Sequence, residues 1–315
     1  MNHRYITPLI AAVALTCATA ASDAQVSPMP TSPVVNPTIP KQLTLCGQVV
    51  DLDNVEHAER YDRELTSAMY THGNTLLTIK RANRYFPQIV PILKANGMPE
   101  DLVYLACVES TLNPRAVSPA KAAGMWQFMA STAKEYGLEV SDEVDERYNI
   151  DKATAAACRF LKKALQRYGG DWNAVFQSYN GGMRRITQQL DEQITDEPLD
   201  LYLAEETQRY PFRIMATKAI MENPARYGFV LTAEQLYTPR EVDYVEVSGP
   251  VASWAQWAKD HGISYNTLRD ENPWIRAPKL TNKLGKTYKV RVPRKNTLKR
   301  STAKHPVYNP KWIQK

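Results

Sequence analysis

The sequence has 315 residues, of which 43% are apolar and 23% are charged. This composition is ordinary for a soluble globular protein, and it excludes a collagen-like chain, a chain disordered throughout and a chain built of membrane spans. The length suggests about two domains. The net charge of +6 is unevenly placed, because residues 272–315 hold 13 Lys and Arg and no acid. The rest holds 26 Lys and Arg against 33 Asp and Glu, so a mildly acidic body carries a basic C-terminal portion.

The first 48 residues are expected to be an export signal and a linker. An apolar run of small residues from Ile6 to Ala21 ends at Ala18-Thr19-Ala20, which fits a small-x-small cleavage site. The run is shorter than the ~20 residues that a membrane span needs, so residues 1–24 are predicted to be a signal peptide. Cys17 leaves lipidation open as an alternative. Residues 25–48 are rich in proline, which stiffens the chain and predicts a linker.

Residues 49–238 have a helical pattern. Apolar side chains recur at three- and four-residue steps, for example over residues 157–165. Pro99 and the acids after it predict one helix start, and a capping box of Thr132 with Glu135 predicts another. We find no strand alternation in this region, which is therefore predicted to be one helical domain.

After Pro239 the pattern changes to strand, helix, helix and strand. The expected elements are strands over residues 242–248 and 288–292 and helices over residues 253–261 and 265–271. We therefore expect a small βααβ domain over residues 239–294, followed by a basic tail over residues 295–315. The predicted fold class is mainly α, with a helical domain and this small second domain.

One acidic residue of the helical region has an unusual setting. Glu109 lies seven and three positions after the apolar Leu102 and Ala106, so it projects from the same helix face. No basic residue lies three or four positions away. A carboxylate on an apolar face is costly to ionise, which raises its pKa and suits it to general acid catalysis. A Glu that points to solvent where Asn113-Pro114 ends the helix fits the pattern equally well.

A resemblance to a known family favours the first interpretation. Five runs occur in the order and at the spacing of the family 1 lytic transglycosylases, namely Glu109 to Ser118, Ala122 to Met129, Tyr148 to Ile150, Tyr179 to Gly182 and Glu206 to Phe229. Members of this family cleave peptidoglycan and have a lysozyme-like fold. The resemblance covers residues 75 to 231 or so, and it implies a lysozyme-like helical domain in the periplasm or cell envelope.

The resemblance also implies roles for eight residues. Glu109 stands where the family has its single catalytic acid and base. The residues that match substrate-binding positions are Ser118, Gln127, Met129, Tyr179, Asn180, Glu206 and Tyr210. Amides and hydroxyls can orient N-acetyl sugars by hydrogen bonds, and aromatic rings can stack on sugar faces. Glu206 is the least specific of these matches, because a plain surface acid fits it too.

The reaction implied by the resemblance needs one carboxyl group. Glu109 would protonate the oxygen that leaves toward N-acetylglucosamine and then accept the proton of the C6 hydroxyl of N-acetylmuramic acid, which closes on C1. A hydrolase would need a second carboxylate. The sequence leaves Asp142, Glu143 and Asp145 open for that role, so a hydrolytic muramidase stays an alternative, as does a catalytically idle wall-binding scaffold. No metal-ligand spacing or phosphate loop is found, and no cofactor is expected.

The small C-terminal domain resembles a degenerate lysin motif (LysM). The runs Tyr244 to Gly249, Trp257 to Lys259 and Gly262 to Ser264 stand at the spacing of the motif, whereas Pro250-Val251-Ala252 replaces its usual Asp-Thr-Leu. The resemblance implies glycan strands as the partner, with a docking or spacer module as the alternative. The basic residues at the C-terminus would add attraction to anionic envelope polymers. Export argues against nucleic acid.

Three cysteines follow the signal peptide: Cys46, Cys107 and Cys158. An odd number does not suggest a disulfide framework. Cys107 and Cys158 lie in apolar helical stretches, where two buried thiols are the favoured interpretation and one bridge is the alternative.

Overall fold

The computed structural model describes residues 36–300, 302 and 304–314. The predicted signal peptide and the first part of the predicted linker lie outside these residues. The helices are α1 (Val55–Tyr70), α2 (His72–Ala95), α3 (Leu102–Ser110), α4 (Ala130–Glu135), α5 (Ile150–Arg167), α6 (Trp172–Gly181), α7 (Met183–Gln193), α8 (Glu205–Glu222), α9 (Trp254–Asp260) and α10 (Tyr265–Glu271). The strands are β1 (Gln42–Leu45), β2 (Gln48–Asp51), β3 (Val242–Val247) and β4 (Tyr288–Pro293). Short 3₁₀ helices are η1 (Glu146–Tyr148), η2 (Pro198–Asp200), η3 (Pro224–Tyr227), η4 (Ala233–Gln235), η5 (Lys295–Leu298) and η6 (Pro310–Trp312). The predicted fold class, mainly α with a βααβ part, is confirmed.

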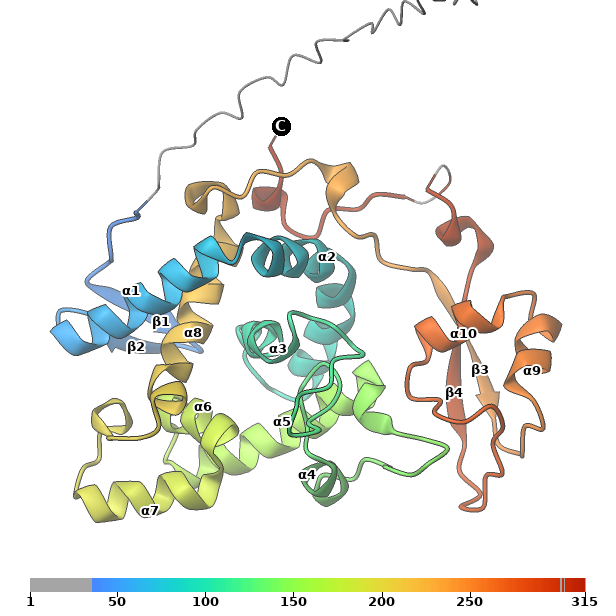
Figure 1. Cartoon of the computed structure of the whole chain (residues 1–315), viewed down its shortest axis with the longest axis horizontal. Coiled ribbons are helices and arrows are strands. Elements are labelled where there is room, and N and C mark those ends of the chain that lie inside the picture. The colour runs from blue at the N-terminus through green and yellow to red at the C-terminus, as the bar shows by residue number, and fades with distance from the viewer. Residues whose placement is uncertain (1–35, 301, 303, 315) are drawn as a thin grey trace, which may run out of the picture. The chain divides into compact units, whose positions relative to one another are not determined.

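Helix α3 lies at the centre of the helical part. It packs between α2 and α8, while α1 packs against α8 and α5 packs against α2 (Figure 1). Leu102 and Ala106 of α3 are fully buried, as their spacing predicts. The helix ends where Thr111 and Leu112 adopt left-handed φ values of 50° and 54°. The last turn of α3 therefore delivers Glu109 to the interior of the helical part.

Residues 42–51 form a β-hairpin that the sequence analysis does not predict. Strands β1 and β2 pair antiparallel, with Leu45 opposite Gln48. The two turn residues, Cys46 and Gly47, both have positive φ, as tight hairpin turns require. Leu45 packs into the helical core. The linker prediction is therefore wrong for the end of its range, because four-residue strands are too short to show a clear alternation.

The predicted capping box is also wrong. Helix α4 begins at Ala130, with Met129 in the N-cap position and no side-chain cap, so Thr132 and Glu135 lie inside the helix. Two backbone hydrogen bonds between Ala123 and Phe128, of 3.0 and 3.2 Å, close the preceding loop at Phe128. The chain is thus free to start the helix before Thr132.

The βααβ part forms as its pattern predicts. Strands β3 and β4 pair antiparallel from Val242 opposite Pro293 to Val247 opposite Tyr288. The hydroxyls of Ser253 and Ser264 accept hydrogen bonds from the first turns of α9 and α10, which fixes where both helices begin. Both helices pack on the strands through a buried apolar cluster that includes Trp254, Leu268 and Val290.

The residues after β4 return to the helical part rather than forming only a basic tail. Trp312 in η6 is 2% exposed, and its indole nitrogen donates to the carbonyl of Met221 in α8 at 2.6 Å. Its ring packs edge-on against Phe86 of α2, with centroids 5.7 Å apart. The amide oxygen of Asn83 accepts from the backbone nitrogen of Tyr308 at 2.7 Å. The prediction of a tail does not hold for this anchored segment.

Cys46, Cys107 and Cys158 are free thiols. The interpretation of Cys107 and Cys158 as buried thiols is therefore confirmed, and the alternative of a bridge is wrong. No helix within residues 36–300, 302 and 304–314 is long and apolar enough to cross a bilayer.

The anchored C-terminal segment yields a first prediction. Trp312→Ala removes a buried ring and its hydrogen bond, so it is expected to lower the free energy of unfolding by about 3–5 kcal/mol. The measurement is urea denaturation followed by circular dichroism. Leu298→Ala, at a side chain that is 41% exposed in η5, is the matched control and is expected to change stability by less than about 0.5 kcal/mol. Equal stability of the two variants would contradict the anchoring.

Candidate active site

Glu109 lies in the last turn of α3, half-buried beneath α8. The hydroxyl of Tyr210 in α8 donates a hydrogen bond to its Oε1 atom. Desolvation raises the pKa of Glu109 to about 7, against the lowering effects of this hydrogen bond and of the positive charge of Arg213. The negative charge of Glu206 raises it further. A carboxyl group with this pKa is partly protonated at neutral pH, so it can give a proton in one step and accept one in the next.

Two tyrosines, the buried Tyr210 and the half-buried Tyr179, lie beside the carboxyl group. Burial and the charge of Glu109 both raise the pKa of Tyr179 and of Tyr210 well above the usual range. Both hydroxyls are therefore neutral donors. Tyr179 donates to the carbonyl of Trp126 at 2.7 Å, which ties α6 to the loop before α4. Tyr210 is used to hold Glu109 rather than to line an open groove.

A cluster of charges stands behind Glu109. Arg213 of α8 lies with its Nη1 atom 3.8 Å from the carboxylate of Glu206 and its Nε atom 2.7 Å from that of Glu64. Glu64 is buried in α1 and is also paired with Arg209. Sequence reasoning did not find Arg213 or Glu64. The spacing of Glu206, Arg209 and Arg213, three to seven positions apart on one helix face, is the signal that could have found the arginine.

The loop over residues 115–128 carries two of the predicted ligands. The hydroxyl of Ser118 accepts from the backbone nitrogen of Ala122 at 3.0 Å. The side-chain amide of Gln127 donates to the carbonyl of Gly124 at 2.8 Å and to that of Ala116 at 3.3 Å. Both side chains therefore hold the loop in shape while remaining half-buried at its surface.

The other predicted residues are placed by helix ends. Asn180, near the end of α6, accepts a 2.8 Å hydrogen bond at Oδ1 from the hydroxyl of Thr207 in α8. A Cβ on the next residue, Gly181, would lie 3.0 Å from the methyl group of Thr207, so the close approach of the two helices favours glycine. Met129 is 43% exposed at the start of α4. Trp126, which the sequence left open between core and cleft, is fully buried.

The structure thus brings four of the predicted residues together. Tyr210 is hydrogen-bonded to Glu109, and the charges of Glu206 and Glu109 shift the pKa values of Glu109 and Tyr179, respectively. Asn180 lies near them because it is hydrogen-bonded to Thr207, the residue after Glu206. Ser118 and Gln127 share a different element, the loop that Trp126 links to Tyr179. Met129 directly follows that loop in the sequence, at the start of α4.

The three acids that the sequence left open as a second carboxylate have other surroundings. The carboxylate of Glu143 accepts from the backbone nitrogen and the hydroxyl of Thr281, both at 2.9 Å. Asp145 is buried and paired with Arg147 at 2.7 Å. Asp142 is exposed beside the same βααβ part as Thr281. The charged residues that shift the pKa of Glu109 are Arg213, which lowers it, and Glu206, which raises it.

The raised pKa of Glu109 leads to a prediction about stability. Because the pKa in the folded protein, about 7, lies above the ordinary value of 4.5, the folded state binds this proton more tightly than the unfolded state. Stability is therefore lost as the pH rises from about 4.5 to 7. Glu109→Gln stays neutral, so its stability relative to the parent should improve by roughly 3 kcal/mol between pH 4.5 and pH 8.

Urea denaturation of both proteins at the two pH values provides the measurement. The difference between pH values cancels any constant effect of the substitution itself. The same stability difference at pH 4.5 and pH 8 would show that Glu109 titrates normally.

Comparisons with known proteins identify related domains in both parts of the chain. Residues 89–199 match the family described as "Transglycosylase SLT domain", and residues 243–296 match "Soluble lytic transglycosylase C-terminal LysM-like domain". The chain is 31% identical over 248 residues to membrane-bound lytic murein transglycosylase D of Escherichia coli K12, a match that covers 78% of this chain and 53% of that protein. It is 37% identical over 94 residues to peptidoglycan transglycosylase gp16 of Escherichia phage T7, covering 29% of this chain and 7% of that protein.

Among solved structures, the 70 kDa soluble lytic transglycosylase SLT70 of Escherichia coli aligns with a TM-score of 0.41 at 17% identity, over 54% of this chain and 33% of that one. The chain spans about half the length of the murein transglycosylase D proteins that it matches. The two family matches cover the helical part around Glu109 and the βααβ part in chain order. The protein therefore contains a transglycosylase SLT domain followed by a LysM-like domain of the kind found at the C-terminus of soluble lytic transglycosylases.

Proposed function

We propose that the protein is a peptidoglycan lytic transglycosylase that cleaves the β-1,4 bond between N-acetylmuramic acid and N-acetylglucosamine. The observation that carries the proposal is the half-buried carboxyl group of Glu109, with a pKa of about 7 and a hydrogen bond from Tyr210. The SLT domain and the relatives named above support the same class of reaction.

Glu109 acts twice in this reaction. Its protonated form gives the proton to the glycosidic oxygen, the bond from C1 to that oxygen breaks, and the N-acetylglucosamine side leaves as an alcohol. The resulting carboxylate takes the proton of the C6 hydroxyl of N-acetylmuramic acid while that oxygen bonds to C1. The product is a 1,6-anhydro sugar, no water is consumed, and Glu109 returns to its protonated form. A pKa near 7 suits both directions of transfer.

The surroundings of the other acids support this reaction over hydrolysis. A hydrolase needs a second carboxylate about 5 to 9.5 Å from the acid to attack C1 or to activate water. Glu143 and Asp145 are engaged by Thr281 and Arg147, which leaves Glu206 as the acid whose charge acts on Glu109. Glu206 is exposed and near Arg213, so the hydrolytic muramidase remains the second candidate, with Glu206 as its base.

The sugar-binding roles are part of the proposal. We assign contacts with the glycan to Ser118, Gln127, Met129, Tyr179 and Asn180, and we assign to Tyr210 the holding of the acid. Glu206 has an electrostatic role through the pKa of Glu109.

The remaining parts of the proposal concern location and partners. We place the protein in the periplasm or cell envelope, exported by the signal peptide predicted over residues 1–24, with peptidoglycan strands as its partner. The described basic residues after β4, Arg294, Lys295, Lys299, Arg300, Lys304 and Lys311, would add attraction to anionic envelope polymers.

The product distinguishes the candidates. Digestion of purified peptidoglycan, followed by mass spectrometry, is expected to give fragments one water lighter than those of lysozyme, because the C6 hydroxyl replaces water as the attacking group. Glu109→Gln cannot deliver the proton and should lose activity by a factor of about 10²–10⁴ or more, while its circular dichroism spectrum stays that of the parent. Fragments with ordinary reducing ends would establish hydrolysis instead.

Glu206 gives a second test. Activity is expected to fall as the pH rises through about 7, since only protonated Glu109 can act as the acid. Glu206→Gln removes a negative charge that raises this pKa, so the fall should move to lower pH, with activity at pH 5.5 within about tenfold of the parent. The matched control is Glu205→Gln, which is expected to leave the pH profile in place. A loss of about 10²–10⁴ at every pH in Glu206→Gln would indicate the base of a hydrolase.

A further inference from the structure

We infer that the LysM-like domain positions the loop that carries Ser118 and Gln127, and that Arg147 is the positioning residue through which it does so. The link is the segment of residues 139–147, which we name the strut. The inference rests on the proposed function to the extent that the loop binds glycan. It assigns to the LysM-like domain a role inside the catalytic domain, besides any binding of its own.

The strut is joined to the LysM-like domain by backbone pairing. The backbone nitrogen of Asp145 donates to the carbonyl of Trp274 at 2.9 Å, and that of Arg276 donates to the carbonyl of Glu143 at 2.8 Å. Val144 and Ile275 form an antiparallel bridge between these bonds. Both side chains are almost fully buried, in the same apolar cluster as the core of the LysM-like domain. The strut therefore pairs with this domain as a short extra strand would.

Opposite charges reinforce the pairing. The carboxylate of Glu139 accepts from the ammonium group of Lys286 at 2.9 Å and from the hydroxyl of Tyr288 at 3.0 Å. Hydrogen bonds from Thr281 hold the pKa of Glu143 below its usual range. The strut holds five acids, whereas the charged residues of the LysM-like domain after Asn272 are all basic. The uneven distribution of charge along the sequence therefore places opposite charges on the two sides of this contact.

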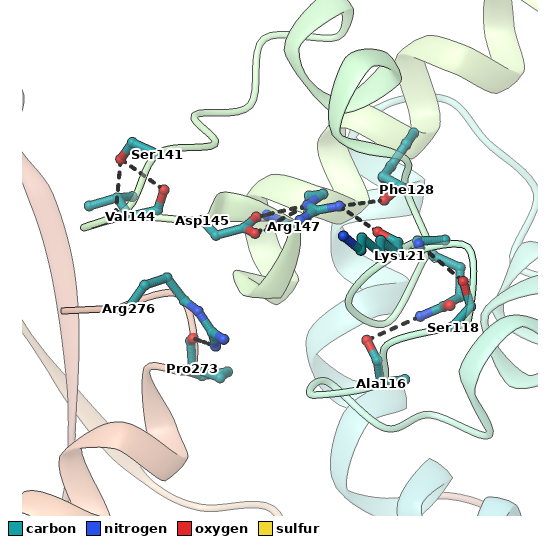
Figure 2. A network of polar contacts seen from close by, with 12 residues as sticks. Ala116, Ser118, Lys121, Phe128, Ser141, Val144, Asp145, Arg147, Pro273 and Arg276 are labelled. Atoms are coloured by element: carbon teal, nitrogen blue, oxygen red, sulfur yellow. Dashed lines mark hydrogen bonds and ion pairs between the residues drawn. The ribbon is translucent and has the colours of Figure 1, made fainter.

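Arg147 connects the strut to the loop. Its side chain is 10% exposed and makes three hydrogen bonds to the carboxylate of Asp145, from Nε to Oδ1 and Oδ2 at 2.9 and 3.2 Å and from Nη2 to Oδ2 at 2.7 Å. Its Nη1 atom donates to the carbonyls of Lys121 and Phe128, at 3.0 and 3.1 Å (Figure 2). One planar guanidinium group thereby fixes two points of the loop in relation to a residue that is bound to Trp274.

The loop also rests directly on the backbone of Arg147. A Cβ at Gly124 would lie 1.8 Å from the carbonyl oxygen of Arg147, so only glycine fits there. Ala123, the residue before it, is buried in the apolar cluster of the LysM-like domain. The loop is therefore held on one side by the guanidinium group and on the other by close packing.

The two points that Arg147 holds lie next to the predicted sugar ligands. Lys121 and Ser118 are joined by a backbone hydrogen bond of 2.8 Å, and Ser118 is joined to Ala122 by a backbone hydrogen bond of 2.9 Å. Phe128 directly follows Gln127. A displacement of either carbonyl would therefore move Ser118 or Gln127. Glu109 is held by α3 and Tyr210. The hydroxyl of Ser110 joins the end of α3 to the carbonyl of Met125 in the loop at 2.8 Å, which is not one of the two points that Arg147 holds, so the strut should affect glycan binding more than the chemical step.

The test uses the full chain with soluble, uncrosslinked glycan strands as substrate. Arg147→Lys keeps the charge but cannot reach both carbonyls and the carboxylate of Asp145. Because hydrogen bonds to a charged group are among the stronger ones in proteins, their loss should raise KM about tenfold or more while kcat stays within about twofold. Glu139→Gln combined with Glu143→Gln weakens the far end of the strut and should raise KM in the same direction. Asp243→Asn breaks an exposed ion pair with Arg294 within the LysM-like domain and is the control, expected to leave KM in place.

Hydrogen–deuterium exchange provides a readout that does not depend on activity. In both strut variants the amides of residues 115–128 should exchange faster, whereas those of α3 should not change. Faster exchange throughout the helical domain with a lower kcat would show a merely structural role and overturn the inference. Unchanged exchange and unchanged KM would overturn it too. A parent protein without transglycosylase activity, but with the expected exchange pattern in the variants, would refute the proposed function and leave the positioning by the strut supported.

Discussion

The site depends on one carboxyl group kept out of water. Glu109 stands at the end of a nine-residue helix whose other side chains are nearly all buried between α2 and α8. Withdrawing a carboxylate from water favours the neutral form, and the raised pKa values of Tyr179 and Tyr210 keep their hydroxyl groups neutral. The Tyr210 hydroxyl satisfies the carboxyl group without neutralising it, because it supplies a dipole and no charge. The raised pKa of Glu109 therefore depends on the tight packing of α3, because looser packing would expose the carboxyl group to water and lower its pKa.

The effect of Arg213 on Glu109 is limited by a second carboxylate. Arg213 lies near enough to lower the pKa of Glu109, yet it is held by Glu64, a buried carboxylate on α1. A guanidinium group paired in this way exerts less of its charge on the acid than a free one would. Helix α1 lies outside the stretch that matches the SLT family, residues 89–199, so part of the electrostatic setting of the acid is supplied by an element that the domain match does not include.

Features set by local sequence were predictable, and those set by distant contacts were not. The periodicity of α3 allowed Glu109 on the buried face, and the family resemblance favoured that placement. The strand and helix patterns after residue 239 gave β3, α9, α10 and β4 nearly to the residue. The hairpin over residues 42–51 and the docking of Trp312 depend on surfaces that other helices provide. The capping box failed because two backbone bonds between Ala123 and Phe128 decide where α4 begins. The positions of Arg213 and of the strut acids can be read from the sequence, but their partners cannot, because those partners lie far away along the chain.

The anchoring of Trp312 has a consequence for the order in which the protein can fold. Its partners Phe86 and Met221 belong to α2 and α8, so a piece of the helical core is supplied by residues that follow the entire LysM-like domain. Closing so long a stretch of chain is slow compared with local helix formation. An emerging chain can form the helices of the helical part early, but their core is complete only when the segment after β4 has been made. The core of the helical part that bears Glu109 is thereby completed only after the LysM-like domain has been synthesised.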